Sequence, residues 1–228
     1  MRTMTIESLE ESKVSLNWLQ GRGWGYQLLI DFLGGPPSLS LIAQWRQYMM
    51  MRDDVVLTDG GQKLQQLLSG IVPQQLVEVC MIEETEYRRL FDSETSIFPS
   101  LCESNYRGMK GKDLAECMLN IHEMYAHHGI VFNKLNHEQD DHIMLELEFM
   151  AVLVERTLDT KRIRSSHLEL IDSQIQFLDQ HLLQWTPQLA EDISFITRSS
   201  LYIEVANVLK EFIAYDMQML RTWRASMI

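Results

Sequence analysis

Cysteine is scarce in this chain, and the cysteines present follow no recognised spacing. The 228 residues include three cysteines, Cys80, Cys102 and Cys117, and no Cys-x-x-Cys pair. An odd number of widely spaced cysteines supports neither a disulfide framework nor a zinc knuckle. The cysteine content therefore indicates a protein of a reducing compartment.

Basic residues are also in short supply relative to acidic ones. There are 20 lysines and arginines against 32 aspartates and glutamates, which gives a formal net charge of −12. A surface of this sign repels nucleic-acid phosphates, so general nucleic-acid binding is excluded. The same surface attracts a cationic partner.

Long hydrophobic runs are absent from the sequence. No uncharged apolar run reaches the ~20 residues that span a bilayer. The first residues carry Glu7, Glu10 and Glu11, where a secretory signal peptide requires an apolar core. We therefore expect a soluble, cytoplasmic protein with no membrane span.

Prolines are few, and the pattern between them is helical. The five prolines are Pro36, Pro37, Pro73, Pro99 and Pro187. We expect them at helix boundaries, with Pro73 and Pro187 in first turns and Thr186 capping the latter helix. Because no segment alternates apolar and polar residues as a strand does, the sequence predicts an all-α protein of about eight to eleven helices. Residues 143–154 are apolar almost all round, which predicts a central helix.

One irregular segment divides this helical pattern. Residues 93–112 contain Pro99, Gly108 and Gly111 and show little periodicity, so we expect a long loop or hinge with a short helix. The single domain 1–228 would then consist of an N-terminal lobe (1–92) and a C-terminal lobe (113–228). If the hinge is flexible, exchange of a lobe between two copies is possible, so the chain is expected to be a monomer or a domain-swapped dimer.

Catalytic motifs are missing, although histidines are concentrated in one segment. Five of the seven histidines lie between His122 and His142, with Glu123, Asp140 and Asp141 nearby. His122 and His127 are five residues apart, about 140° around a helix, and so cannot share one metal ion from a regular helix. His142 and Glu146 are four residues apart and can share one metal ion from a regular helix. Gly21-Arg22-Gly23-Trp24-Gly25 follows no strand, which favours helix-boundary glycines over a phosphate-binding loop.

The tripeptide Asp140-Asp141-His142 directly precedes the apolar segment. An aspartate there can cap the first turn of the following helix, which is a structural role. It can also form a polar patch at the mouth of an apolar groove, where a carboxylate meets an arginine. The residues alone leave both interpretations open.

Several segments together resemble the motifs of the TorD/DmsD family of redox-enzyme maturation chaperones, which includes the NarJ-type chaperones. The strongest is DDHIMLELEFMAVL, Asp140 to Leu153. Others occur in the family's order: Arg22 with Tyr26-Gln27-Leu28-Leu29, Glu86-Tyr87-Arg88-Arg89-Leu90-Phe91, Glu103-Ser104-Asn105-Tyr106, Tyr125-x-x-x-Gly129, and Phe177-Leu178 through His181-Leu182 to Trp185-Thr186-Pro187.

This resemblance implies an all-α fold without cofactor or catalysis of its own. It also implies a cytoplasmic chaperone that binds the twin-arginine signal peptide, and the body, of the apo form of a molybdenum-cofactor oxidoreductase until the cofactor is inserted. An acidic protein with an apolar groove complements the cationic and apolar halves of such a peptide. The family's peptide-contacting positions become Tyr87, Leu90, Phe91, Cys102, Ser104, Asp141 and His142.

Two other function classes remain open from the sequence. One is a helical adaptor for another cytoplasmic partner, including a NarJ-like client that lacks a cleaved signal. The other is a metal-dependent enzyme that uses the histidine-rich segment 122–142. The client oxidoreductase is not specified by the sequence.

Overall fold

The computed structural model describes residues 6–52, 58–92, 98, 101–132, 139–158 and 164–227, and these confirm the predicted all-α fold. Within these ranges there is no β-strand, only an isolated bridge between Cys102 and His142. The helices are α1 (Ile6–Leu33), α2 (Leu39–Met51), α3 (Asp59–Gly70), a 3₁₀ turn (Pro73–Gln75), α4 (Leu76–Phe91), α5 (Glu103–Tyr106), α6 (Gly111–His127), α7 (Ile143–Leu158), α8 (Arg164–Phe177), a π-helical turn (Leu178–Leu182), α9 (Leu183–Ile196) and α10 (Ser200–Ser226).

Side-chain caps and prolines define several of the helix ends. Ser38 Oγ accepts a hydrogen bond of 3.1 Å from Leu41 N at the start of α2. Ser199 Oγ accepts one of 3.2 Å from Tyr202 N at the start of α10. Pro73 opens the 3₁₀ turn before α4, as the sequence predicts. Each serine accepts a hydrogen bond from a backbone N–H that has no partner within its helix. At Pro73 the backbone N–H is absent, so no partner is needed.

The prediction for Pro187 is wrong, because this proline lies inside α9. Thr186 caps no helix; its hydroxyl donates 2.8 Å back to the carbonyl of Leu182. A proline inside a helix removes one N–H and crowds the carbonyl four residues earlier. Here that residue is Leu183, which directly follows the π-helical turn, so the α-helical hydrogen-bond ladder is already interrupted there.

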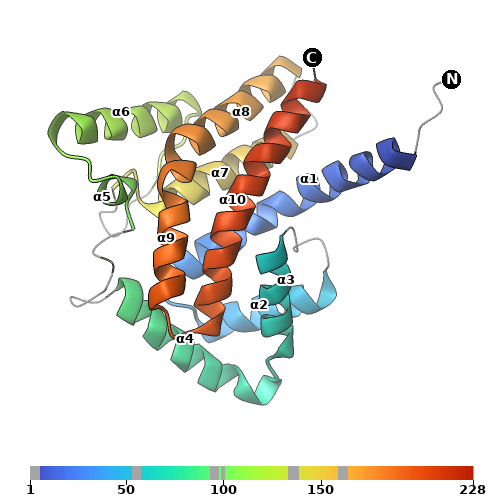
Figure 1. Cartoon of the computed structure of the whole chain (residues 1–228), viewed down its shortest axis with the longest axis vertical. Coiled ribbons are helices and arrows are strands. Elements are labelled where there is room, and N and C mark those ends of the chain that lie inside the picture. The colour runs from blue at the N-terminus through green and yellow to red at the C-terminus, as the bar shows by residue number, and fades with distance from the viewer. Residues whose placement is uncertain are drawn as a thin grey trace.

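Helix α10 runs through the middle of the molecule, with α6 and α8 towards one end and α4 at the other (Figure 1). It packs against α1, α3, α8 and α9, and α7 packs along α1. Nine residues of α7 are buried, which confirms that segment 143–154 is a central helix. The division into lobes stays a prediction, and residues 93–97 and Pro99 lie outside the described residues.

Glycines let α10 approach two other helices closely. A Cβ built on Gly25 of α1 would lie 2.5 Å from the Phe212 ring, and one on Gly60 would lie 2.9 Å from Asn207 Cβ. Gly21, Gly23 and Gly25 are thus interior residues of α1 and not helix-boundary glycines, which corrects that expectation. Close packing, and not a phosphate or a helix end, is the role that the structure gives Gly25.

A buried ion pair joins α1 to α10 beside this crossing. Arg22 Nη2 lies 2.8 Å from Asp216 Oδ2, and both side chains are fully buried. Trp18 Nε1 and Tyr26 Oη donate to the same carboxylate at 2.7 Å each. Gln174 of α8 accepts a second bond from Arg22 at 2.7 Å. The carboxylate is therefore well satisfied, as a buried charge requires.

No helix in the described part of the chain is both long enough and apolar enough to cross a bilayer.

Candidate functional site

The first group of predicted site residues lies in the last turns of α4. Leu90 is fully buried, and Tyr87 is buried with its hydroxyl donating 3.3 Å to the carbonyl of Leu33. The Phe91 ring is half-buried and stacks on Phe98 with ring centroids 5.6 Å apart. Of these three predicted residues, Phe91 thus presents the most surface to a partner.

The second group forms where α5 meets the start of α7. Ile143 N donates 2.8 Å to Leu101 O, and Glu103 N donates 2.9 Å to Asp141 O, so the two segments run antiparallel. Cys102 and Ser104 are buried at this contact, as is Asp141. The predicted residues Cys102, Ser104, Asp141 and His142, from two distant stretches of chain, are therefore neighbours in the structure.

The capping role of Asp141 is real but concerns a different helix from the expected one. Its Oδ2 accepts a 2.9 Å hydrogen bond from Ser104 N and so caps α5, not α7. His142 takes the position before α7, and its Nδ1 accepts from Met144 N at 3.3 Å. The Asp141 side chain is fully buried, whereas His142 is half-buried.

Phe98 and Leu101 connect the two groups. Phe98 N donates 3.1 Å to Leu90 O, which holds this residue against the end of α4. Leu101, three residues later, pairs with Ile143 at the start of α7. Three residues span at most about 11 Å of extended chain, so the two groups belong to one region of the molecule.

A cluster of buried polar side chains lies under the α5–α7 contact. His181 Nδ1 is 2.8 Å from Glu103 Oε2, and His181 Nε2 is 2.8 Å from Asn120 Oδ1. Arg107 forms an ion pair with the other oxygen of Glu103. Burial raises the pKa of Glu103, but the hydrogen bond and charge of His181, followed by those of Arg107, outweigh it and leave that pKa below the usual range.

The sequence motifs contained Glu103 and His181, but no role was predicted for either. Glu103 stands on α5, and His181 stands on the π-helical turn. Such turns often occur at functional sites. Helical periodicity gives no sign of a π-helical turn, so the pairing of these two residues could have been suspected only from their shared membership of the family-like segments.

A second buried carboxylate, Glu146 of α7, belongs to the same region. Its Oε2 accepts a 3.2 Å hydrogen bond from Trp185 Nε1. Burial, followed by the nearby charge of Glu103, raises the pKa of Glu146 well above its usual value. A carboxyl group in this position is therefore stabilised in its protonated form.

The same cluster contains the described residues best placed to hold a metal ion. Ligand atoms of Glu103, Cys117 and His181 lie within 4.8 Å of one another. Burial raises the pKa of Cys117 to about 12, and its thiol donates to Glu103 at 3.6 Å. Because these groups already bond to one another and Arg107 supplies the positive charge, we interpret the cluster as a hydrogen-bonded network.

Among its described residues, the histidine-rich segment forms no group that could hold a metal ion. His122 faces Asp140 at 3.8 Å, while His127 contacts Glu169 of α8 at 2.9 Å. His142 caps α7, and Glu146 is turned towards Trp185. His137 lies outside the described residues. His122, His127 and His142 therefore contact three separate groups, and His128 packs its ring against that of His127 with centroids 4.9 Å apart.

Comparison with known proteins then places this arrangement in a family. The family model described as nitrate reductase delta subunit matches residues 59–191, more than half of the chain. The chain belongs to the nitrate reductase delta subunit family. The matched range includes all seven predicted site residues and the Glu103–His181 pair, whereas the Arg22–Asp216 pair lies outside it.

The curated relatives of this nitrate reductase delta subunit family member are named as chaperones. Chaperone protein TorD of Vibrio atlanticus is 30% identical over 117 residues, which are 51% of this chain and 54% of that protein. Chaperone protein TorD of Vibrio cholerae serotype O1 (strain O395) is 30% identical over 97 residues, covering 42% and 43%. Chaperone protein TorD of Actinobacillus pleuropneumoniae serotype 3 is 27% identical over 106 residues, covering 46% and 48%.

The chain thus spans about half the length of the curated relatives it matches. No solved structure matches it. The family, TorD/NarJ-type redox-enzyme maturation chaperones, consists of helical proteins that are not enzymes.

Proposed function

We propose that this protein is a cytoplasmic chaperone for a molybdenum-cofactor oxidoreductase. It binds the twin-arginine signal peptide, the body of the apo-enzyme, or both, and holds the enzyme until the cofactor is inserted and export can begin. It carries out no reaction itself. The observation that supports this most strongly is the family match over residues 59–191, with curated relatives named as TorD chaperones.

The burial of the predicted site residues suggests which of them contact the client and which support those contacts. Phe91 and His142 are half-buried and are proposed to contact the client directly. The other five, Tyr87, Leu90, Cys102, Ser104 and Asp141, are buried and are proposed to hold these two in place. The electrostatic part of recognition comes from the net charge of −12, which favours a cationic peptide.

A second candidate function concerns a different kind of client. The family model that matches this chain is described as nitrate reductase delta subunit. A chaperone of that type can serve a client whose N-terminal segment is not a cleaved export signal. The chain would then act as a maturation adaptor that recognises the body or the uncleaved N-terminus of its partner.

Titration calorimetry with two synthetic peptides separates the candidates. The first peptide carries two consecutive arginines before an apolar segment, and the second has both arginines replaced by glutamine. Binding of the first and weak binding of the second support the twin-arginine function. If neither peptide binds while the apo-oxidoreductase without its signal co-purifies with the chain, the second candidate is correct.

A further inference from the structure

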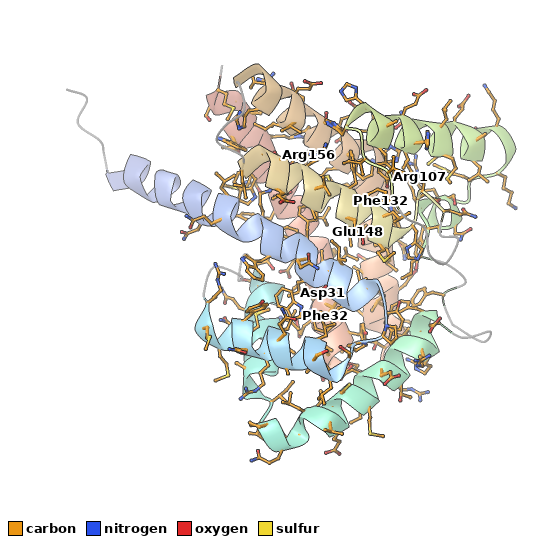
Figure 2. The ribbon with its side chains drawn as sticks, turned by 180° about the vertical axis from the view of Figure 1, so that it is seen from behind. Asp31, Phe32, Arg107, Phe132, Glu148 and Arg156 are labelled. Carbon is orange, nitrogen blue, oxygen red and sulfur yellow. The ribbon has the colours of Figure 1, made fainter. Side chains whose placement is uncertain are left out.

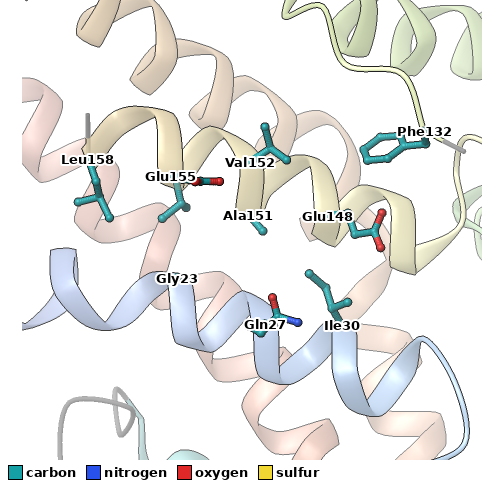
Figure 3. Close-up of a pocket in the computed structure, with 10 residues that line it drawn as sticks. Gly23, Gln27, Ile30, Phe132, Glu148, Ala151, Val152, Glu155 and Leu158 are labelled. Atoms are coloured by element: carbon teal, nitrogen blue, oxygen red, sulfur yellow. The ribbon is translucent and has the colours of Figure 1, made fainter. Parts of the chain in front are cut away.

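Two hollows of the described surface have similar volumes but differ in the residues that line them. The first lies between α1 and α7 and has a volume of about 460 Å³ (Figure 3). Its carboxylate Glu148 already has an interaction partner in the chain, so the charge of this hollow indicates no occupant. The second has a volume of about 470 Å³ and lies where the end of α3, the first half of α4 and the start of α10 meet. We call it the α4 groove.

The α4 groove lies at the end of the molecule that α4 occupies in Figure 1 and Figure 2. Its apolar lining consists of Leu67, Ile71, Val79, Ile82 and Leu201. Ile82 is 54% exposed although its side chain is large and apolar. Gly70 also lines the groove, and a Cβ built on it would have no packing neighbour within 4 Å. The groove therefore has room for apolar side chains of a partner.

One cationic side chain lines the α4 groove without an ion pair. Arg198 lies just before α10 and is exposed. Its backbone N–H donates 2.6 Å to Glu86 Oε1, but its guanidinium group forms no ion pair in the described part of the chain. An exposed guanidinium group beside apolar side chains is suited to bidentate pairing with a carboxylate.

Two carboxylates of α4 hold the segment around Arg198, and both are engaged in other bonds. Glu83 is buried and accepts a hydrogen bond from the Ser199 hydroxyl, and burial raises the pKa of its carboxyl group and so favours the neutral form. Glu86 accepts two hydrogen bonds of 2.7 Å from Arg89. The positive charge of Arg198 is therefore available to a partner.

The surroundings of the α4 groove are cationic on balance. Arg46 donates from Nε to the carbonyl of Ile71, and Lys63 is exposed one helical turn before Leu67 on the same side of α3. One exposed carboxylate, Glu78, lies nearby on α4. The first residues of α10 also line the groove, and the positive end of the helix dipole acts in the same direction. This local charge is opposite in sign to the net charge of −12.

We propose that the α4 groove is a second protein-binding surface, which takes an acidic amphipathic segment of a partner protein. A carboxylate of that segment pairs with Arg198, and its apolar side chains pack against Leu67 and Ile82. This goes beyond the function proposed above, because a twin-arginine signal is cationic and the charge of the groove disfavours it.

The dimensions of the groove suit one face of a helix. Residues three or four apart lie side by side on a helix, so a partner helix can present apolar side chains with a carboxylate next to them. The groove volume lies within the 300–1,000 Å³ usual for ligand sites, which accommodates a few such side chains.

The test uses a synthetic helical peptide with leucines along one side and glutamates beside them, and a second peptide with glutamine in place of each glutamate. Binding to the full chain is followed by fluorescence anisotropy at 0.15 M salt, where a Debye length of about 8 Å screens the repulsion from the rest of the acidic protein. We expect the glutamate peptide to bind about three- to tenfold more tightly. Equal binding of both peptides, or binding of neither, overturns the proposal.

A matched pair of substitutions locates the charged contact. Arg198→Gln removes the cation of the groove, and Lys110→Gln removes an exposed cation at the start of α6, towards the other end of the molecule. Both change the net charge equally, so a long-range field effect alters both alike. We expect the first to weaken binding of the glutamate peptide about three- to tenfold and the second less than about twofold. Equal losses contradict the assignment to the groove.

A second pair tests the apolar contact at neighbouring positions of α4. Ile82 lines the groove, whereas Met81, 64% exposed, does not. We expect Ile82→Ser to weaken binding of the glutamate peptide and Met81→Ser to leave it unchanged, with thermal melting to confirm that both fold. If Ile82→Ser unfolds the protein, Gly70→Leu decides instead, because its side chain enters open space in the groove: unchanged binding contradicts the proposal.

Two further measurements distinguish other occupants. If ultracentrifugation shows a wild-type dimer that Ile82→Ser dissociates, a second copy of the chain covers the groove and the proposal is wrong. If the twin-arginine peptide competes with the glutamate peptide for the groove, selection by charge is wrong. Failure of the twin-arginine peptide to bind anywhere would contradict the function proposed above and would leave the result for the groove unchanged.

Discussion

At the scale of single residues, burial separates neighbours that the sequence treats alike. The family resemblance assigns both Leu90 and Phe91 to the peptide-contacting positions. Leu90 is fully buried, while Phe91 keeps part of its ring accessible beside Phe98. Substitutions at the two positions should therefore report on different properties of the protein.

Leu90→Gln places a polar amide in the core and should lower the free energy of unfolding by about 2–5 kcal/mol. Phe91→Ser should cost less stability and should weaken binding of the twin-arginine peptide. Thermal melting and peptide titration on both variants check this. A Phe91→Ser protein that melts much earlier than wild type but binds normally would show that Phe91 only packs in the core.

Asp141 provides a second residue-scale prediction, because its carboxylate caps α5. Asp141→Ala removes the acceptor for Ser104 N and should destabilise the protein by about 1–2 kcal/mol. Asp141→Asn keeps an acceptor oxygen and should be less destabilising. Urea unfolding of both variants measures the difference. Equal losses would mean that the negative charge, and not the cap, is what Asp141 contributes.

At the scale of helices, the residues between α9 and α10 are held to α4 by the carboxylate of Glu86. Glu86 accepts hydrogen bonds from Arg89 at 2.7 Å, from the Thr197 hydroxyl at 2.8 Å and from Arg198 N at 2.6 Å. The hydrogen bonds of Arg89, joined by that of the Arg198 amide, outweigh burial and lower the pKa of Glu86 to about 2. This junction should therefore depend on pH.

The sign follows from the lowered pKa. Glu86 contributes stability that is fully present above its ordinary pKa of 4.5 and is lost as the pH falls towards about 2. The difference corresponds to roughly 3 kcal/mol. Urea unfolding between about pH 5 and pH 2 should show a steeper loss for wild type than for Glu86→Gln. Glu84→Gln, which removes an exposed carboxylate of the same helix, should keep the wild-type slope.

The elements themselves were largely predictable, and their long-range pairing was not. Apolar spacing and proline positions indicate the helices because both act within a few residues. The π-helical turn at Leu178–Leu182 escaped prediction because its sequence has ordinary helical periodicity. Asp141 was assigned to the wrong helix because its partner on α5, Ser104, lies 37 positions earlier in the chain. The ion pair of Arg22 with Asp216 joins residues that are 194 positions apart. No local pattern encodes such contacts.

At the scale of the whole molecule, the net charge of −12 should govern how quickly a cationic peptide is captured. Electrostatic attraction acts mainly on the association rate, and salt screens it over a Debye length that shrinks from about 30 Å at 0.01 M to about 3 Å at 1 M. We expect the association rate of the twin-arginine peptide to fall at least about tenfold across that range.

The matching control is the peptide with both arginines replaced by glutamine, whose association rate should change much less with salt. Stopped-flow measurements with both peptides give the comparison. The same salt dependence for both would show that the charge of the protein does not guide the arginines.

The crossing of α1 and α10 has a consequence for the whole molecule. In an ordinary helix, exchanging glycine for alanine gains about 0.5–1 kcal/mol because the unfolded chain loses freedom. At Gly25 the added methyl group would stand 2.5 Å from the buried Phe212 ring, so the helices would have to separate. Arg22 and Asp216, about one turn away on each helix, would separate with them. Gly25→Ala should therefore lower the melting temperature. One methyl group would weaken the Arg22–Asp216 ion pair without contacting either residue, because it would force the two helices apart.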